Sequence, residues 1–291
     1  MTPVQSRTFY AVATAGSITT AAKVLNISQP TITSQVKDLE AHYGVELFHR
    51  HPRGVTLTDA GRELLVIIRR IHTNQQDAIE FLQSVQDLHT GHLRIGSYGP
   101  YDVINIMAEF TRCYTSLTCS LTFANSGKLH DDLHNHNLDV AVFTQLEAPS
   151  EFHSLPYNKN KQVVIVGKAH PWSNRKYVNI KDLEGERLIV REPGSEVGRA
   201  TEEILQSSNV TPANIIEIGS REGSVAAVAQ DVGVCLIFDE GIIPNNLVTK
   251  LQIRGVDIVS HVDVVCLAER RDSRIINCFF EVAEQLLHAE K

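Results

Sequence analysis

The chain has 291 residues, 43% of them hydrophobic, and a formal net charge of −7. Its length suits one large or two ordinary domains, and its composition is that of a globular protein that can bury a core. No uncharged apolar run of about 18 residues occurs, and Met1–Tyr10 lacks the basic and apolar regions of a secretory signal, so we expect a cytoplasmic protein rather than a membrane or secreted one.

The first 70 residues are basic although the whole chain is acidic. They hold eight Lys or Arg and five Asp or Glu, a net charge of +3, which leaves −10 for the remainder. Such asymmetry favours nucleic-acid binding by the basic end, but a charge of +3 is common on small domains. The elements predicted within this segment therefore decide its function.

Three helices are predicted in quick succession before residue 43. The first ends at Gly16, which can adopt the left-handed conformation that closes a helix. Ser17 and Ser28 are suitable N-caps for the second and third helices, and Pro30 falls in a first turn, where a missing N–H costs little. The apolar residues of the third helix recur at helical spacing: Ile32, Val36 and Leu39.

The opposite face of the third helix is rich in hydroxyl and amide side chains. Its residues are Gln29, Thr31, Thr33, Ser34, Gln35 and Lys37. An exposed helix face usually carries Glu, Lys and Arg, which are better helix formers. Gln can pair with adenine, and Thr and Ser can contact base edges or phosphates in the major groove. The face predicts a recognition helix, and an ordinary three-helix packing module is the alternative.

A basic turn rich in Pro and Gly follows the third helix. It lies between two short extended stretches, around Leu47–His49 and Val55–Leu57, and predicts a β-hairpin. Arg50 and Arg53 near its tip would meet phosphates or a minor groove, whereas the alternative is a solvated turn.

A long ordered set of residues runs through this segment. It comprises Ala13, Gly16, Ser17, Ile18, Thr19, Ala21, Ala22, Leu25, Ser28, Gln29, Pro30, Thr31, Ile32, Thr33, Gln35, Val36, Leu39, Glu40, Leu47, Phe48, Arg50, Leu57, Thr58, Ala60 and Gly61. The order and spacing resemble the signature of LysR-type transcriptional regulators nearly position for position. The resemblance implies an all-α winged helix-turn-helix DNA-binding domain over residues 1–58. Where many relatives carry Arg this chain has Ser34, so that contact would be absent or made by Gln35 or Lys37.

The residues expected at double-stranded DNA are therefore Ser17, Ser28, Gln29, Pro30, Thr31, Thr33, Ser34, Gln35, Lys37, Arg50 and Arg53.

A linker helix is predicted over residues 59–90. Its seam follows a heptad spacing, with one polar residue filling a gap: Leu64, Ile68, Ile71, Gln75, Ala78, Leu82 and Val85. A helix packed on its own domain is the alternative, but an exposed seam of this length would be a liability, which favours dimerisation. The resemblance implies that this helix pairs with its twin in a dimer or tetramer, which would prefer an operator with two-fold symmetry.

From Gly91 onward, short apolar runs alternate with helical patterns. The predicted strands are Leu93–Ser97, Ser120–Phe123, Val140–Phe143, Val163–Gly167, Arg187–Val190, Ile215–Ile218, Val234–Phe238 and Val262–Ala268. The predicted helices are Val103–Cys113, Lys128–Asn135, Val197–Ser207, Ser224–Gln230 and Ile275–His288. This alternation predicts an α/β domain with parallel sheets, whose ligands lie at the carboxyl ends of strands.

Four predicted strands end in loops that combine hydroxyl, amide and charged groups. The candidate effector residues in them are Ser97, Tyr98, Gly99, Tyr101, Asn125, Ser126, Arg191, Glu192, Ser195, Arg221 and Glu222. Helix N-termini and Arg favour an anion, and the two Glu could balance an amino group, so we expect a small anionic or zwitterionic effector. Turn chemistry is the alternative for any single loop.

The resemblance implies a two-lobed effector domain over residues 91–291, similar to periplasmic binding proteins. Lobe one would comprise about 91–160 and 261–291, and lobe two about 161–260. Arg191–Ser195, Ser220–Glu222 and Tyr43–Phe48 resemble the subfamily associated with aminoethylphosphonate catabolism, which implies 2-aminoethylphosphonate or a related metabolite. Another carboxylate, a sulfur metabolite or an amino acid is the alternative, and Glu196 places an extra carboxylate near the expected anion.

Other functions receive less support from the residues. The five cysteines form no Cys-x-x-Cys pair, and no second cluster completes a metal shell around His130, His134 and His136, so we expect no metal and no cofactor. No phosphate-binding Gly-x-x-x-x-Gly-Lys loop or Gly-x-Ser-x-Gly elbow occurs, which argues against an enzyme. An α/β enzyme would leave the N-terminal module unexplained, and the lack of a secretory signal at Met1–Tyr10 argues against a solute-binding protein. RNA polymerase is a further candidate partner, and no membrane is expected.

Overall fold

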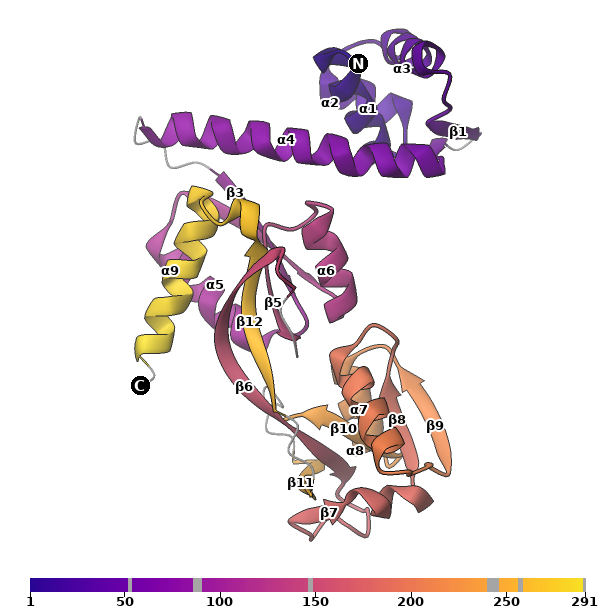
Figure 1. Ribbon diagram of the computed structural model, residues 1–291, viewed down its shortest axis with the longest axis vertical. Coiled ribbons are helices and arrows are strands. Elements are labelled where there is room, and N and C mark those ends of the chain that lie inside the picture. Colours follow the sequence, from indigo (N-terminus) through magenta and orange to yellow (C-terminus); the bar gives the residue numbers. More distant parts are fainter. Residues whose placement is uncertain (52–53, 86–90, 146–148, 240–245, 256–258, 290–291) are drawn as a thin grey trace. The chain divides into compact units, whose positions relative to one another are not determined.

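The computed structural model describes residues 1–51, 54–85, 91–145, 149–239, 246–255 and 259–289 (Figure 1). The chain divides into two compact units, Met1–Val85 and Gln86–Lys291. Each unit has its own apolar core.

The first unit is a winged helix-turn-helix followed by a long helix. Its elements are α1 (Pro3–Ala15), α2 (Ile18–Leu25), α3 (Gln29–Tyr43), β1 (Phe48–His51), β2 (Gly54–Leu57) and α4 (Asp59–Val85). Ser17 and Ser28 are the N-caps of α2 and α3, and Gly16 closes α1 in the left-handed conformation, which confirms these three predictions.

The hairpin is fastened to the helices at a glycine. The backbone N–H of Val55 donates to the carbonyl oxygen of Gly16 at 3.0 Å. A side chain at Gly54 would lie 2.6 Å from that same oxygen, so the close approach requires glycine there. The wing is therefore positioned by the turn between α1 and α2.

Helix α4 forms as predicted, but its seam divides into two parts. Ile68 is fully buried in the core formed with Phe9 and Ile32, and Leu64 packs against that core. The expectation that both residues face a partner is thus corrected, because α1 already covers that side of α4. The exposed apolar residues of α4 instead include Ile67 (57%), Ile71 (49%) and Leu82 (65%).

Two of the remaining seam residues are exposed. Gln75 and Ala78 are exposed on α4, in line with Ile71 and Leu82. The side chain of Val85 lies outside the described part of the chain.

The second unit is a two-lobed α/β domain. Its strands are β3 (Gly91–Ser97), β4 (Leu117–Phe123), β5 (Val140–Gln145), β6 (Phe152–Gly167), β7 (Tyr177–Asn179), β8 (Arg187–Arg191), β9 (Asn214–Ile218), β10 (Val234–Phe238), β11 (Val248–Arg254) and β12 (Val259–Leu267). Its helices are α5 (Tyr101–Cys113), α6 (Ser126–His134), η1 (Ile180–Gly185), α7 (Glu196–Ser207), α8 (Arg221–Ala229), η2 (Ala268–Arg270) and α9 (Arg274–Ala289).

In lobe one, helices cover both faces of the strands. Strands β4, β3 and β5 are parallel neighbours, and β12 joins β5 in antiparallel orientation. Helices α5 and α9 share a core with one face, and α6 packs on the other (Figure 1).

Lobe two is built around β10, β8 and β9, with β6, β11 and β7 beside them. Its two apolar cores lie on opposite faces, one against α7 and the other against α8.

Strand β6 runs through both lobes. The first half of β6 pairs with β12 in lobe one, and its second half pairs with β10 and β11 in lobe two. These pairings are antiparallel, so the sheets combine the predicted parallel strands with antiparallel ones. The sequence also predicted only the end of β6 and neither β7 nor β11. The polar residues in the first half of β6 conceal the strand, because they interrupt its apolar pattern.

Candidate DNA-binding and effector sites

The outer face of α3 is available for contact. Ile32, Val36 and Leu39 are buried, whereas Gln29, Pro30, Thr31, Ser34 and Lys37 are exposed. The Ser28 hydroxyl caps the helix by accepting from the backbone N–H of Thr31 at 3.2 Å. The start of α3 therefore presents polar groups, and its unpaired backbone N–H groups, to an approaching anion such as a phosphate.

Three predicted DNA contacts have partners inside the unit. The Gln35 amide oxygen accepts from the Thr8 hydroxyl of α1, because Gln35 lies beside the buried stripe. The half-buried Gln35 thus makes a packing contact with α1, and its predicted contact with the groove stays a prediction. The Ser17 hydroxyl accepts from the Thr20 N–H at 3.3 Å, and the Ser34 hydroxyl donates to Asp38 at 3.3 Å. The half-buried Thr33 lies at the edge of the exposed face.

Glu40 joins the wing to α3. One oxygen of this carboxylate accepts from the backbone N–H groups of Leu47 at 2.8 Å and Phe48 at 3.2 Å. The other lies 3.9 Å from the guanidinium of the exposed Arg50. Arg50 is thus held on the wing, and Arg53 lies outside the described residues.

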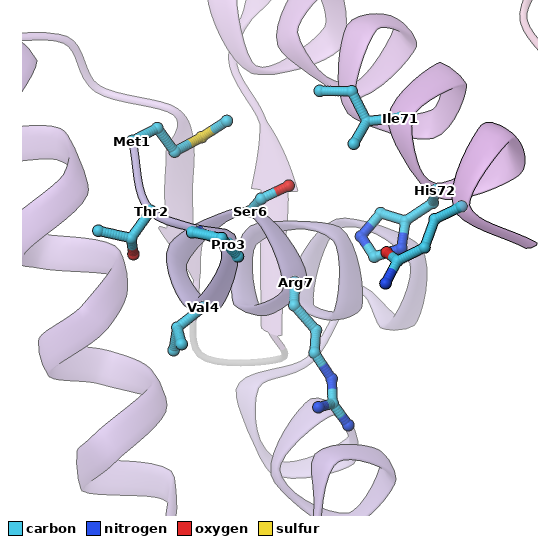
Figure 2. A pocket seen from close by; sticks show the side chains of 9 residues that line it. Met1, Thr2, Pro3, Val4, Ser6, Arg7, Ile71 and His72 are labelled. Atoms are coloured by element: carbon cyan, nitrogen blue, oxygen red, sulfur yellow. The ribbon is translucent and has the colours of Figure 1, made fainter. Parts of the chain in front are cut away.

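A groove of about 620 Å³ separates the start of α1 from the middle of α4. Its lining residues are Met1, Thr2, Pro3, Val4, Ser6, Arg7, Ile71, His72 and Gln75, most of them labelled in Figure 2. The Ser6 hydroxyl and Nε2 of His72 are buried, with no hydrogen-bond partner among the described residues. Burial, and then the charge of Arg7, lowers the pKa of His72, whose ring stacks on Tyr10. The groove thus contains apolar surface and neutral polar atoms.

In the second unit, two predicted effector loops from different lobes touch. The Gly127 N–H donates to the Gly194 carbonyl at 3.0 Å, and the Asn125 amide donates to the Pro193 carbonyl at 3.5 Å. Asn125 and Ser195 are the N-caps of α6 and α7. The starts of these two helices therefore meet at the lobe boundary.

Arg191 is already paired. Its guanidinium donates to both oxygens of Glu192, at 2.8 and 3.0 Å. Burial raises the pKa of Glu192, but hydrogen bonds from Arg191 and nearby groups outweigh it, and the net pKa lies below the usual value. An anionic ligand would have to compete with the Glu192 carboxylate for the Arg191 guanidinium.

Two predicted hydroxyls serve the backbone instead of a ligand. The Ser97 hydroxyl lies 2.7 Å from the Gly99 carbonyl and 2.8 Å from the Val142 carbonyl, and it is fully buried. The Ser126 hydroxyl donates to the Thr144 carbonyl at 3.1 Å. Both therefore hold the loops in place.

Arg221 makes a second contact across the lobes. It is only 6% exposed, donates to the Phe238 carbonyl at 2.8 Å and lies 5.5 Å above the ring centre of Tyr101 in lobe one. Its neighbour Glu222 is exposed. Burial is the main cause that raises the pKa of Tyr98 to about 12; Asp102 raises it further, and Arg221 acts against both. Tyr98 is therefore a neutral hydroxyl between opposite charges.

A group of buried polar residues on β6 and the strands beside it was not predicted from the sequence. This hinge cluster comprises Thr144 of β5, Asn160 and Gln162 of β6, and Ser260 of β12, none more than 6% exposed. The Gln162 carbonyl oxygen and the Ser260 hydroxyl have no hydrogen-bond partner in the described part of the chain. The Thr144 hydroxyl and the Asn160 amide lie close enough to the Tyr98 hydroxyl to lower its pKa, but neither makes a hydrogen bond of normal geometry. Each unmet buried group costs about 1–3 kcal/mol, so a cluster of them favours the binding of water or of a polar ligand there.

A sequence signal for this cluster exists. Asn158, Asn160 and Gln162 alternate with lysines just before the apolar run Val163–Val166. Alternating residues lie on one face of a strand, so three amides at this spacing predict a polar face beside a buried core.

The three histidines in and after α6 differ in their surroundings, and His134 is exposed. His130 packs edge-on between the rings of Phe143 and Phe152, and burial lowers its pKa. His136 is buried, 3.6 Å from Glu269. Among the described residues, no group of three or more His, Cys, Asp or Glu is arranged to hold a metal.

Taken together, the fold and these sites define a DNA-binding protein that carries a separate two-lobed sensing domain. Two family models match the chain: "Bacterial regulatory helix-turn-helix protein, lysR family" over residues 4–62 and "LysR substrate binding domain" over residues 86–287. The chain belongs to the LysR family of DNA-binding transcriptional regulators and is not an enzyme. Within the described residues, no helix has the length and apolar character needed to cross a bilayer.

Individual relatives agree with this assignment. The chain is 31% identical over 239 residues to the HTH-type transcriptional regulator CfxR of Cupriavidus necator, a match that covers 80% of this chain and 74% of that protein. It is 28% identical over 284 residues to the HTH-type transcriptional activator CmpR of Synechocystis sp., which covers 95% and 93%. Full-length CbnR, solved in complex with its target DNA, has the same fold, with a TM-score of 0.69 at 21% identity over 98% of this chain and 99% of that chain.

Proposed function

We propose that this regulator reads its operator with the first turns of α3, chiefly Gln29, and clamps the backbone with Lys37 and Arg50. The observation that supports this most directly is the exposed amide and hydroxyl face over the buried Ile32 and Val36. Gel shift with DNA from upstream of its own gene, at several salt concentrations, tests the proposal. Sequence-selective binding that weakens steeply with salt is expected, and its absence would contradict DNA reading.

The regulator self-associates through the exposed seam of α4. Ile67, Ile71 and Leu82 would otherwise leave apolar surface in water, and Ile71 also lines the groove beside α1. A two-fold dimer, alone or within a tetramer, would present two recognition helices to a symmetric operator. Footprinting should then reveal two equivalent half-sites.

The effector is a small anionic or zwitterionic molecule held at the lobe boundary. Two helix starts, the Arg191–Glu192 pair and Arg221 supply the charges for it. The motifs around Arg191 and Arg221 make 2-aminoethylphosphonate the first candidate, with other carboxylates, sulfur metabolites and amino acids next. Thermal-shift screening of the full chain against these compounds identifies the effector.

Effector binding alters transcription by favouring one arrangement of the lobes and of the oligomer over another. A ligand can do this only through different affinities for the two arrangements. RNA polymerase is the further candidate partner of this step. In vitro transcription from the footprinted promoter, with and without effector, tests whether polymerase responds.

A further inference from the structure

The hinge cluster forms one continuous polar face. Asn160 and Ser260 are direct cross-strand partners, and Val262 pairs with both Asn158 and Thr144. Because side chains alternate along a strand, Asn160, Gln162, Ser260 and Thr144 point to the same side of the sheet. The face therefore crosses from lobe one into lobe two along β6, the long strand in Figure 1.

The polar atoms of this face that lack hydrogen-bond partners include both acceptors and donors, so a ligand that pairs with them must offer both donors and acceptors. The Gln162 and Asn160 carbonyl oxygens can only accept, and the Asn160 amide nitrogen can only donate. The Thr144 and Ser260 hydroxyls can do either. A purely anionic ligand, which offers acceptors alone, would leave the two carbonyl oxygens unmet.

The charges beside the face are balanced. Asp102, only 7% exposed in the first turn of α5, accepts from the Asn158 amide at 3.2 Å, and Arg221 lies on the lobe-two side. The Arg221 guanidinium lies 5.5 Å from the ring centre of Tyr101, the residue before Asp102, so both charges lie at the start of α5. Arg191 is neutralised by Glu192. A dianion would leave this balanced environment with excess negative charge, whereas a ligand with one charge of each sign would match it.

We infer that the effector is a small zwitterion, with its ammonium group toward Asp102 and the carbonyl oxygens of Asn160 and Gln162, and its anionic group toward Arg221 and the Asn160 amide nitrogen. This inference rests on the proposed effector function and names the ligand class that the function requires. The bound ligand then makes hydrogen bonds with the hinge cluster itself, which lies on the strands about which the lobes would move.

The first experiment needs no ligand. Asn160→Leu replaces the amide by an apolar group of similar size in the full-length protein. If the Asn160 amide has a hydrogen-bond partner only when a ligand is bound, its removal should leave the unliganded protein equally stable or raise its melting temperature by about 2–4 °C. A lower melting temperature would show that Asn160 has a structural partner, and would overturn the inference.

The second experiment compares matched probes by calorimetry on the full-length protein. 2-Aminoethylphosphonate and β-alanine are compared with ethylphosphonate and propionate, which lack the ammonium group, and with ethylamine, which lacks the anion. We expect saturable binding of at least one zwitterion, and binding at least about tenfold weaker for its single-charge analogues. Asp102→Asn should remove this preference, and Asn160→Leu should abolish binding. Asn214→Leu, the same change at an exposed strand position, should bind as the wild type does.

Two results would overturn the zwitterion assignment: equal or tighter binding of the single-charge analogues, or no saturable binding by these zwitterions or by a panel of α- and ω-amino acids. DNA binding is measured on the same preparations. If it stays sequence-selective and salt-sensitive, the ligand class alone is wrong. If it is absent as well, the proposed regulatory function fails too.

Discussion

At the scale of single residues, the start of α3 concentrates the DNA-reading chemistry. The Ser28 hydroxyl caps the helix and the Gln35 amide oxygen accepts from Thr8, so each of these two groups already has a partner within the unit. Gln29 is exposed at the first position of the helix. Gln29 is therefore the principal side chain of α3 whose amide can make two hydrogen bonds to one base in the major groove.

Gln29→Ala is therefore expected to weaken binding to the preferred operator by about 1–3 kcal/mol and to relax selectivity at one base pair. Anisotropy titrations against an operator and its single-base variants measure this effect. Lys37→Ala is the matched comparison, because loss of a phosphate contact should weaken all sequences alike and reduce the salt slope by about 1. An equal loss on every sequence for Gln29→Ala would show that it is not a base reader.

A buried carboxylate stabilises lobe one. Asp139, 4% exposed, accepts from the Arg94 guanidinium at 2.7 and 3.0 Å and from Arg270 at 2.5 Å. Burial alone would raise the pKa of Asp139, but the hydrogen bonds and charges of the two arginines outweigh it and hold the pKa below its usual value. The ionised form is thus the one that the fold stabilises.

Removing this carboxylate should be costly, because two arginines would lose a buried partner. Asp139→Ala is expected to lower the free energy of unfolding by about 3–5 kcal/mol at pH 7. Because the folded-state pKa is depressed, the contribution of Asp139 is complete above the unfolded value of about 3.9 and is lost as the pH falls through the folded value. Urea unfolding from pH 7 to 2 should then show a shallower acid decline in Asp139→Asn than in the wild type. Equal slopes would contradict the assigned shift.

At the scale of elements, α4 has two roles along its length. Its first turns complete the core of the winged unit through Ile68, and its later turns expose Leu82 and Ile71. Heptad spacing describes the whole helix, but one side of the early turns is occupied by α1. Only the exposed part remains for a partner.

Leu82→Glu should therefore weaken self-association at least about tenfold, because burial of a Leu contributes about 1.5–3 kcal/mol and a two-fold interface contains two copies. Sedimentation velocity over a range of concentrations measures the change. Gln76→Glu adds the same charge on a different face of α4 and should leave the oligomer intact. An unchanged oligomer in Leu82→Glu would place the interface elsewhere.

At the scale of the whole molecule, function requires that the effector domain and the DNA-binding unit share a free-energy coupling. Such coupling is reciprocal by thermodynamic necessity. The interlobe contacts at Gly127–Gly194 and Tyr101–Arg221 are the parts of the second unit that a ligand at the hinge would reinforce or break.

We expect the factor by which the effector changes operator affinity to equal the factor by which the operator changes effector affinity, typically about 5–150-fold. Titrating each ligand in the presence and absence of a saturating concentration of the other measures both factors. Scrambled DNA is the control and should leave effector affinity unchanged. Different factors on the two sides of the cycle would indicate an unrecognised change of oligomeric state.

The sequence alone determined the local features of this protein. Helix caps such as Ser17 and Ser28, the order of the α-helices and the signature from Ala13 to Gly61 depend on neighbours within a few residues, so they can be read from the chain. The identity of the family followed from that ordered signature.

Tertiary structure decided which side chains remain available. Gln35 and Ile68 matched their predicted patterns, yet α1 engages both from a distant part of the sequence. Asn160 and Ser260 lie 100 positions apart in the chain and meet only because β6 and β12 pair. The spacing of residues in the sequence predicts the face of a helix or strand on which a residue lies, whereas long-range packing decides which other element covers that face.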